Sequence, residues 1–251
     1  MIALIDGDIY AYKASSSVQK DIYWGDGLWT CHSYEEDAIE VFETIVEEIQ
    51  YSLANHGVQC SSLLFAFSDP DENFRKTIDP NYKANRIGNR KPVCYNGLVD
   101  WIKNNYEAIS YKGLEADDCL GLSTNNATVI VSDDKDFKTV PGRFLRFSED
   151  ELYIIDKETA DKNLLIQALM GDKVDGYSGC PTMGPVKAAR LINGTKKEDL
   201  WKTYVQQFLN QGLTEQDAYH SVCLARILRP GEYDHSNKTP ILMDPADLLR
   251  N

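Results

Sequence analysis

The stretch Ile2-Ala3-Leu4-Ile5-Asp6-Gly7-Asp8 is a short apolar run that ends abruptly in an acidic turn. Such a run, stopped by aspartate and glycine, is typical of a buried strand followed by a turn. The same pattern recurs at Leu63 to Phe67, followed by Ser68-Asp69-Pro70, and at 128–131, followed by Ser132-Asp133-Asp134. Three predicted strands therefore end at aspartates.

Predicted helices alternate with these strands. Residues 35–54 carry an apolar stripe at helical spacing, and Ser33 and Glu36 have the spacing of a capping box at its start. A second helix is predicted at 93–106, followed by a short strand at 108–111. Alternating strands and helices indicate an α/β fold with a mostly parallel central sheet flanked by helices. In such sheets the binding site lies beyond the carboxyl ends of the strands, so we expect the aspartates to meet there.

After about residue 157 the pattern becomes one of successive helices. They are predicted at 158–170, 185–192, 197–209 and 214–228, and a glycine-rich connector, 171–184, joins the first two. The segment after Arg229 is irregular and contains three prolines. We therefore expect an α/β domain at 1–156, a helical module at 157–230 and an irregular tail at 231–251.

The composition is that of an ordinary globular protein, with 43% hydrophobic and 26% charged residues. The longest apolar run is far shorter than the roughly 20 residues that a membrane span needs, and no basic segment precedes an apolar one at the start. We expect a cytoplasmic protein without a membrane partner. The six cysteines form no CxxC pair, which argues against a zinc finger or a disulfide scaffold.

The net charge of −13 argues at first against nucleic acid as a ligand. Its distribution changes that view, because residues 75–91 carry six basic residues and one acidic residue. Much of the acid lies in short clusters near the predicted strand ends. An acidic chain with one basic segment can bind DNA when metal ions neutralise its carboxylates; the alternative is a generic acidic surface.

Carboxylates help to cut an anionic phosphodiester when they hold cations, and oxygen ligands favour Mg²⁺ or Mn²⁺. Two such ions can activate water and stabilise the leaving oxygen. Without metal, crowded carboxylates should have raised pKa values. Taken alone, the acidic run 115–118 could be an ordinary helix start, and the connector acids could be loop polarity. Asp8 and Asp133 are left out, Asp133 because it should point away from Asp134. The candidate ligands are Asp6, Asp69, Glu115, Asp117, Asp118, Asp134, Asp136, Asp172 and Asp175.

Six motifs in order give the chain a family resemblance. They are IDGD at 5–8, NYKANR at 81–86, LEADD at 114–118, DKDFKT at 134–139, GDKVDGYSG at 171–179 and ARILR at 225–229. With these motifs the chain resembles the flap endonuclease/5′-nuclease superfamily, and within it the 5′→3′ exonucleases of T-seven-like bacteriophages. The similarity spans residues 2 to about 230.

The resemblance implies a PIN/5′-nuclease-like fold in which the nine acids hold two Mg²⁺ ions, with Mn²⁺ as a substitute. It implies that Lys83 contacts the scissile phosphate, with Arg86 beside it, as the catalytic cations. Segment 70–92 would form the arch or clamp over the site. Tyr12 would stack on the terminal base, although helix packing is an equal alternative. Residues implied to bind phosphates of the 5′ strand are Arg75, Lys76, Arg90 and Lys91.

The connector resembles the family's helix–three-turn–helix, here within 165–192. The resemblance implies that Gly179, Gly184 and Lys187 grip the downstream duplex and that K⁺ binds there. Thr182 departs from the family pattern, which usually has glycine at this position. Since glycine permits backbone conformations that threonine resists, K⁺ coordination is the feature in question.

The expected activity is 5′→3′ exodeoxyribonuclease action on duplex DNA by two-metal-ion hydrolysis. The resemblance extends this to 5′ flaps and RNA–DNA hybrids, hence RNA-primer removal in phage replication, by a monomer in the host cytoplasm. The short segment between Asp69 and Val93 favours exonuclease action over threading of long flaps. The alternatives are a catalytically silent structure-specific DNA-binding protein and a PIN-type ribonuclease, whose domains usually lack the connector.

Overall fold

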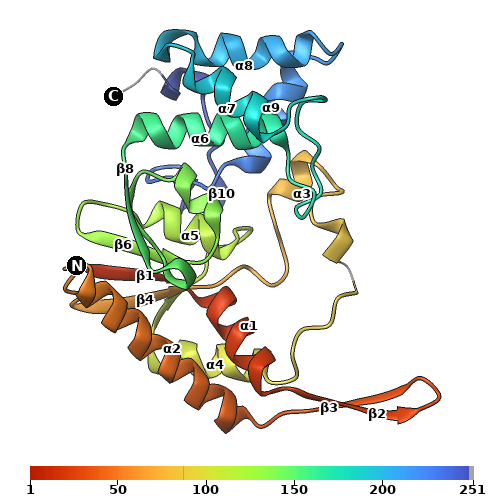
Figure 1. Cartoon of the computed structure of the whole chain (residues 1–251), viewed down its shortest axis with the longest axis vertical. Helices are drawn as coiled ribbons and strands as arrows, with labels where there is room; N and C mark the ends of the chain where they lie inside the picture. The colour runs from red at the N-terminus through yellow and green to blue at the C-terminus, as the bar shows by residue number, and fades with distance from the viewer. Residues whose placement is uncertain (87, 249–251) are drawn as a thin grey trace.

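The computed structural model describes residues 1–86 and 88–248, and its centre is a six-stranded sheet (Figure 1). The strand order is β5-β4-β1-β6-β7-β8, parallel except for the antiparallel pair β7 and β8. This confirms the predicted α/β fold, whereas β7 and β8 were not predicted. The strands are β1 (Ile2–Asp6), β4 (Ser62–Ala66), β5 (Glu107–Ile109), β6 (Thr128–Ser132), β7 (Gly142–Arg146) and β8 (Glu151–Ile155).

The register of the central strands aligns their carboxyl ends. Ile5 lies between Phe65 of β4 and Val131 of β6, so the chain leaves all three strands at one edge of the sheet. All five residues of β6 are buried, as expected for an interior parallel strand covered on both faces. The residues after these strands therefore share one small region.

Helices cover both faces of the sheet. Ala3 and Ile5 pack with α1 (Gly7–Val18), α2 (Glu35–Asn55) and α4 (Tyr95–Asn105), while Leu4 faces α5 (Ala116–Leu122). The helix predicted at 35–54 is confirmed, but its predicted capping box is wrong. Tyr34 is the N-cap residue and gives no side-chain cap, because the Ser33 hydroxyl instead lies 2.5 Å from Cys94 Sγ.

The C-terminal helices share a second core. They are α6 (Lys157–Met170), α7 (Pro185–Asn193), α8 (Leu200–Leu209) and α9 (Glu215–Ala225), and they bury Leu165, Ile192 and Tyr204 among them. The last helix ends at Ala225, not at 228 as predicted, because the backbone of the next residues bonds to buried charged side chains. Among the described residues, no helix has the length and apolarity that crossing a bilayer requires.

Short elements complete the chain. An antiparallel hairpin, β2 (Lys20–Gly25) and β3 (Leu28–His32), extends from the body between α1 and α2 and was not predicted (Figure 1). The short helix α3 (Arg75–Ile78) begins the basic segment, of which residue 87 lies outside the described residues. The predicted irregular tail holds a small pair, β9 (Tyr233–Asp234) and β10 (Thr239–Pro240); residues 249–251 of it lie outside the described residues.

Candidate active site

Two strand ends place Asp6 and Asp134 side by side. Asp6 ends β1 and caps α1 by accepting a hydrogen bond from the Ile9 amide at 3.1 Å. Ser132 ends β6, and its hydroxyl donates to Asp6 Oδ2 at 2.9 Å and accepts from the Asp134 amide at 3.1 Å. Burial, and then the charge of Asp8, raise the pKa of Asp6 to about 7.

Asp136 lies beside Asp134 in the turn after β6. The Asp136 amide donates to Asp134 Oδ1 at 2.9 Å, and the Asp136 carboxylate accepts from Gln167 Nε2 at 2.6 Å and from Lys135 Nζ at 2.9 Å. Burial and the charge of Asp136 raise the pKa of Asp134. Asp133 points away from this pair, as predicted, and bonds to Lys13 and the Ser148 amide.

The start of α5 contributes two carboxylates with opposite pKa shifts. Burial disfavours the charge of Glu115, yet Lys83 and then Arg75 lower its pKa to about 2. Burial raises the pKa of Asp117 well above its usual range, and the neighbouring charges of Glu115 and Asp118 raise it further. Lys83 Nζ donates to Glu115 Oε1. Asp117 therefore lacks the neutralising contacts that Glu115 has.

The connector brings the last two acids to the same place. Tyr82, buried at 2% exposure, donates its hydroxyl to Glu115 Oε2 at 2.9 Å and lies 3.2 Å from Asp175 Oδ2. Burial raises the pKa of Asp175, and the charge of Asp175 in turn raises the pKa of Asp134. Asp172 Oδ1 accepts from the amide of Asp175 at 3.3 Å. Tyr82 was missed by the sequence analysis, although it lies inside the NYKANR motif beside Lys83.

Lys83 reaches this region through a strained backbone. Its φ of +54° is in the left-handed region, which costs a residue other than glycine roughly 1–2 kcal/mol. The Lys83 amide donates to the Asp175 carbonyl at 2.8 Å, and Asn85 Nδ2 donates to the Val174 carbonyl at 3.1 Å. The NYKANR motif is thus fixed against the connector, which holds the ammonium group of Lys83 among the carboxylates.

Asp69 is bonded to two loops, the one after β4 and the one before α5. Although partial burial opposes its charge, hydrogen bonds from the Gly113 amide (2.6 Å) and the Asp71 amide lower its pKa. The strand end is occupied by Ser68, whose amide donates to Asp8 Oδ2 at 3.0 Å. Asp8, which the sequence analysis left out, lies close enough to Asp6 to raise its pKa.

Arg75 and Asp118 form a buried ion pair. Arg75 is 2% exposed, so the prediction that it binds DNA phosphates is wrong. Its guanidinium donates to both Asp118 oxygens (2.7 and 2.8 Å), to Glu115, and to the carbonyls of Leu224 and Arg226. All five of its N–H groups are engaged. Asp118 also accepts from the Leu228 amide, so a metal ion would have to compete for oxygens that are already bonded.

The remaining predicted DNA contacts lie on the surface around the carboxylates. Lys76 is exposed at the start of the basic segment. Arg90 is 57% exposed and bonds to the hairpin, and Lys91 Nζ lies 4.1 Å from the centroid of the Tyr95 ring. Tyr12 on α1 is half exposed and meets the edge of Tyr95. These four side chains are accessible to a ligand.

Four residues of the connector have left-handed φ values, and Gly179 and Thr182 are the two that bear on the prediction. A side chain on Gly179 (φ +60°) would come within 2.3 Å of the Gly171 amide, so this position requires glycine. Thr182 has φ +66°, where a β-branched residue is rare. The sequence departure at Thr182 therefore coincides with a backbone conformation that favours glycine. Gly184 caps α7 in open space, and Lys187 is exposed.

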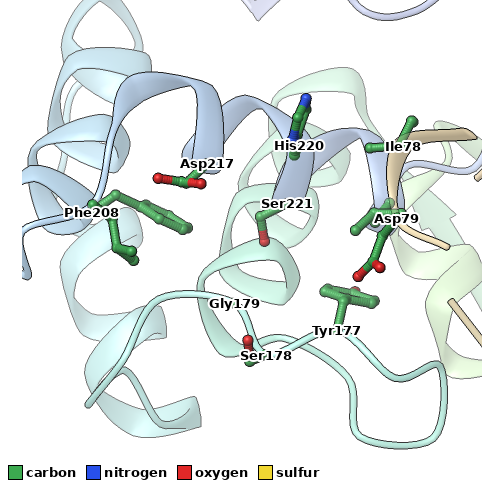
Figure 2. Close-up of a pocket in the computed structure, with 11 residues that line it drawn as sticks. Ile78, Asp79, Tyr177, Ser178, Gly179, Phe208, Asp217, His220 and Ser221 are labelled. Atoms are coloured by element: carbon green, nitrogen blue, oxygen red, sulfur yellow. The ribbon is translucent and has the colours of Figure 1, made fainter. Parts of the chain in front are cut away.

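A cavity of about 250 Å³ lies against the connector, apart from the carboxylates (Figure 2). None of the nine predicted acids lines it. It is lined by Ile78, Asp79, Tyr177, Ser178, Gly179, Phe208, Leu213, Asp217, His220, Ser221 and Leu224. The carboxylate cluster therefore lies outside this cavity.

The structure gathers eight carboxylates around four cations, counted among the described residues. Lys83, Arg86 and Lys135 pair with carboxylates of this set alone, and Arg86 Nη2 bonds to Asp175 at 2.7 Å. The fourth cation, Arg75, pairs with Glu115 and with Asp118 outside the set. We define this set as the carboxylate cluster: Asp6, Asp8, Glu115, Asp117, Asp134, Asp136, Asp172 and Asp175. Anions exceed cations in a partly buried, all-oxygen site, which suits hard divalent cations.

Several known proteins are similar to this chain in sequence or in fold. The chain is 30% identical over 283 residues to an exodeoxyribonuclease of Enterobacteria phage T3, covering 97% of this chain and 93% of the relative. It is 29% identical to an exonuclease of Escherichia phage T7, with the same coverage. The flap endonuclease of bacteriophage T5, in a complex with DNA and metal ions, has a similar fold (TM-score 0.62, 15% identity, covering 89% of this chain and 88% of that chain).

A second T5 structure, co-crystallised with metal ions, agrees equally well (TM-score 0.64, 14% identity, covering 89% of this chain and 88% of that chain). At these identities the two structures establish the fold alone. Residues 1–163 match the family described as 5′-3′ exonuclease, N-terminal resolvase-like domain. The chain therefore belongs to the 5′-3′ exonuclease family and is an enzyme of the exonuclease type.

Proposed function

We propose that this protein hydrolyses phosphodiester bonds of duplex DNA from the 5′ end, with two divalent cations held by the carboxylate cluster. The observation that carries the proposal is the excess of carboxylates over cations in the partly buried cluster at the strand ends. Structural relatives from phage T5 were crystallised with metal ions, and one of them with DNA. Family membership supplies the 5′→3′ polarity.

The donor set fits Mg²⁺, with Mn²⁺ as a substitute. Oxygens of Glu115, Asp117 and Asp118 lie within 4.8 Å of one another, but those of Asp118 are bonded to Arg75. We assign direct or water-mediated ligation to Asp6, Asp8, Glu115, Asp117, Asp134 and Asp136, with Asp172 and Asp175 completing a second position. When bound, such ions lower the pKa of water and withdraw charge from the reacting phosphate.

Lys83 supplies the positive charge that the protein itself contributes. Its ammonium donates to Glu115 and lies 3.7 Å from Asp175, and these contacts raise its pKa despite burial. It stays charged and faces the cluster, where it would stabilise negative charge developing on the phosphate. Tyr82 holds the two carboxylates that orient Lys83.

The surrounding residues would hold the nucleic acid. Lys76, Arg90 and Lys91 would contact phosphates of the 5′ strand, and Tyr12 would stack on its terminal base. The connector with Gly179, Gly184 and Lys187 would grip the duplex. K⁺ would bind there if Thr182 provides its carbonyl in the observed left-handed conformation.

The division into a catalytic domain (1–156), a DNA-binding module (157–230) and a tail (231–251) belongs to the same proposal. So do action on RNA–DNA hybrids, RNA-primer removal during phage replication and a monomeric state. Segment 70–92 is short and packs against the connector through Lys83 and Asn85, which favours removal of short fragments over the threading of long flaps.

A duplex with a 5′-labelled flap tests the proposal. We expect Mg²⁺-dependent release of labelled mono- or short oligonucleotides, with EDTA abolishing the reaction and Mn²⁺ restoring it. Product length separates stepwise exonuclease action from a single cut at the flap base. Binding of the flap without cleavage at saturating Mg²⁺ would establish a silent DNA-binding protein, and cleavage of single-stranded RNA alone a PIN-type ribonuclease.

A further inference from the structure

The hairpin formed by β2 and β3 carries large apolar side chains on both faces and packs neither face into a core. Five of the six residues of β2 and four of the five in β3 are exposed. Tyr23 is 55% exposed and Trp29 59%. Figure 1 shows the hairpin extending from the lower end of the molecule. Contiguous exposed apolar surface of this kind marks an interaction site.

The two faces of the hairpin differ in chemistry. Tyr23 pairs with Trp29 directly across the strands, with ring centroids 4.7 Å apart, and Asp21 pairs with Cys31 two residues further along the same face. Arg90 Nη2 lies 2.8 Å from Cys31 Sγ and 3.9 Å from Asp21. This face, which we call the Tyr23 face, therefore combines an aromatic pair with an arginine.

The opposite face is also exposed but has an internal hydrogen bond. Trp24 Nε1 donates to the Thr30 hydroxyl at 2.8 Å, and Ile22 lies across from Thr30. Lys20 shares this face, yet among the residues that the structure describes no cation lies over the Trp24 ring and no arginine bonds to this face. This second face therefore offers an internal control of the same hairpin.

A continuous series of contacts joins the Tyr23 face to the carboxylate cluster. The Tyr95 hydroxyl donates to Asp8 Oδ1 at 2.8 Å, and Lys91 lies over the Tyr95 ring. Arg90, next to Lys91, reaches the hairpin at Cys31. A line of one aromatic ring and two cations thus leads from the candidate active site to Cys31, which lies two residues from Trp29 on the Tyr23 face.

We propose that the Tyr23 face binds the single-stranded part of a DNA 5′ strand, stacking its bases on Tyr23 and Trp29 while Arg90 and Lys91 hold its phosphates. Alternating aromatic and basic side chains suit single strands, whose bases expose π-faces between phosphates. A protein partner would account for the aromatic pair but not for the two cations that lead to the carboxylates. The inference rests on the proposed function, because it takes DNA as the substrate.

Affinity for tailed DNA gives the first test. In EDTA, the wild type would be titrated with a blunt duplex and with the same duplex carrying a 5′ tail of ten thymidines. The Y23A/W29A variant should bind the tailed duplex at least about 30-fold more weakly and the blunt duplex unchanged, because it loses two rings on which bases stack. W24A is the matched control and should keep both affinities.

Tryptophan fluorescence gives the second test, which leaves Tyr23 and Trp29 unchanged. A variant with Trp24, Trp101 and Trp201 replaced by Phe retains Trp29 alone, and its emission should be quenched by an oligothymidylate. The matched variant that retains Trp24 alone should not respond. Equal quenching in both, no quenching in either, or equal loss of tailed affinity in W24A and Y23A/W29A would overturn the proposal.

These readouts are separate from catalysis. If the wild type binds tails through Trp29 but cuts no DNA with Mg²⁺, the proposed nuclease function fails and the hairpin inference stands. If the wild type cuts DNA and Y23A/W29A binds and cuts tailed DNA as well as the wild type does, the hairpin inference fails and the nuclease function stands.

Discussion

Asp117 and Asp118 are neighbours in one helix, yet they belong to two kinds of charged region. Asp118 is fully buried, and Arg75 and a backbone amide satisfy its oxygens. Asp117 faces the carboxylate cluster, where burial and adjacent anions raise its pKa well above the usual range. We call the first the complete region, because the charges of Arg75 and Asp118 are paired within it. We call the second the incomplete region, because its carboxylates exceed its cations and require added positive charge.

The complete region is a structural clamp. Arg75 connects α3 and α5 to the backbone after α9, and Arg229 pairs in a similar way with buried Asp161 at 2.5 Å. Removing one partner of such a pair leaves an uncompensated buried charge. The carboxylate cluster shows the converse, since strongly perturbed carboxylates at a surface site are typical of function. Net charge balance thus separates the two roles.

The largest effect is expected on cleavage, when a carboxylate of the incomplete region is removed. D134N should lower Mg²⁺-dependent cleavage by at least about 1,000-fold, because a metal ligand supports several kcal/mol of transition-state stabilisation. DNA affinity in EDTA should change little. The neighbouring D133N is the matched control, since Asp133 bonds to Lys13 and Ser148 outside the cluster. Measurable turnover by D134N at saturating Mg²⁺ would count against the metal site.

The next largest effect is expected on stability, when the ion pair of the complete region is broken. R75M should lower the free energy of unfolding by about 3–5 kcal/mol, because it leaves the Asp118 charge buried without its partner. Urea denaturation measures this loss, and the double variant R75M/D118L should recover part of it. If R75M were instead as stable as the wild type but bound DNA weakly, the result would support the predicted contact of Arg75 with DNA phosphates.

Lys83 tests whether the cluster's own cation serves catalysis. K83M should lower kcat by about 100- to 1,000-fold, as expected when one charge-stabilising group is removed from an active site. Single-turnover cleavage of the flap substrate separates this from weaker binding. K112M is the control, because Lys112 is exposed and pairs with Glu72. An unchanged single-turnover rate for K83M would show that Lys83 is structural.

Asp6 links the incomplete region to pH. Its folded pKa of about 7 exceeds the usual 3.8, so the folded state holds this proton more tightly than the unfolded state. The stability it contributes is complete below pH 3.8 and is lost as pH rises through about 7. Between pH 5 and 7.5, metal-free wild type should lose about 3 kcal/mol more than D6N does. Denaturant titrations in EDTA at several pH values measure this difference. If the unfolding free energies of the wild type and D6N changed in parallel with pH, the prediction would be wrong.

The smallest effect is expected at the rim. Arg86 is half exposed and pairs with Asp175, so R86A should change the free energy of unfolding by less than about 1 kcal/mol. The same denaturation assay as for R75M applies. A loss comparable to that of R75M would mean that the rim pair is as structural as the buried clamp.

Local pattern predicted the sheet and most of the acids. Apolar runs that stop at aspartate identify strand ends, and the register of β1, β4 and β6 brings those ends together as expected. The hairpin was missed, although Asp26-Gly27 between two aromatic runs is a recognisable turn signal. At β4 the pattern gave the right strand end, but the partner of Asp69 there, the amide of Gly113, is 44 positions away and could not be predicted from local pattern.

The sequence by itself determined that many carboxylates would meet at one sheet edge, because strand and helix periodicities are local properties. Tertiary structure alone decided which of them are neutralised. Arg75 bonds to Asp118, which is 43 residues further along the chain, and Lys83 bonds to Glu115, which is 32 residues further along. Electrostatic partners are set by distance in space and by burial, and neither can be read from neighbours along the chain.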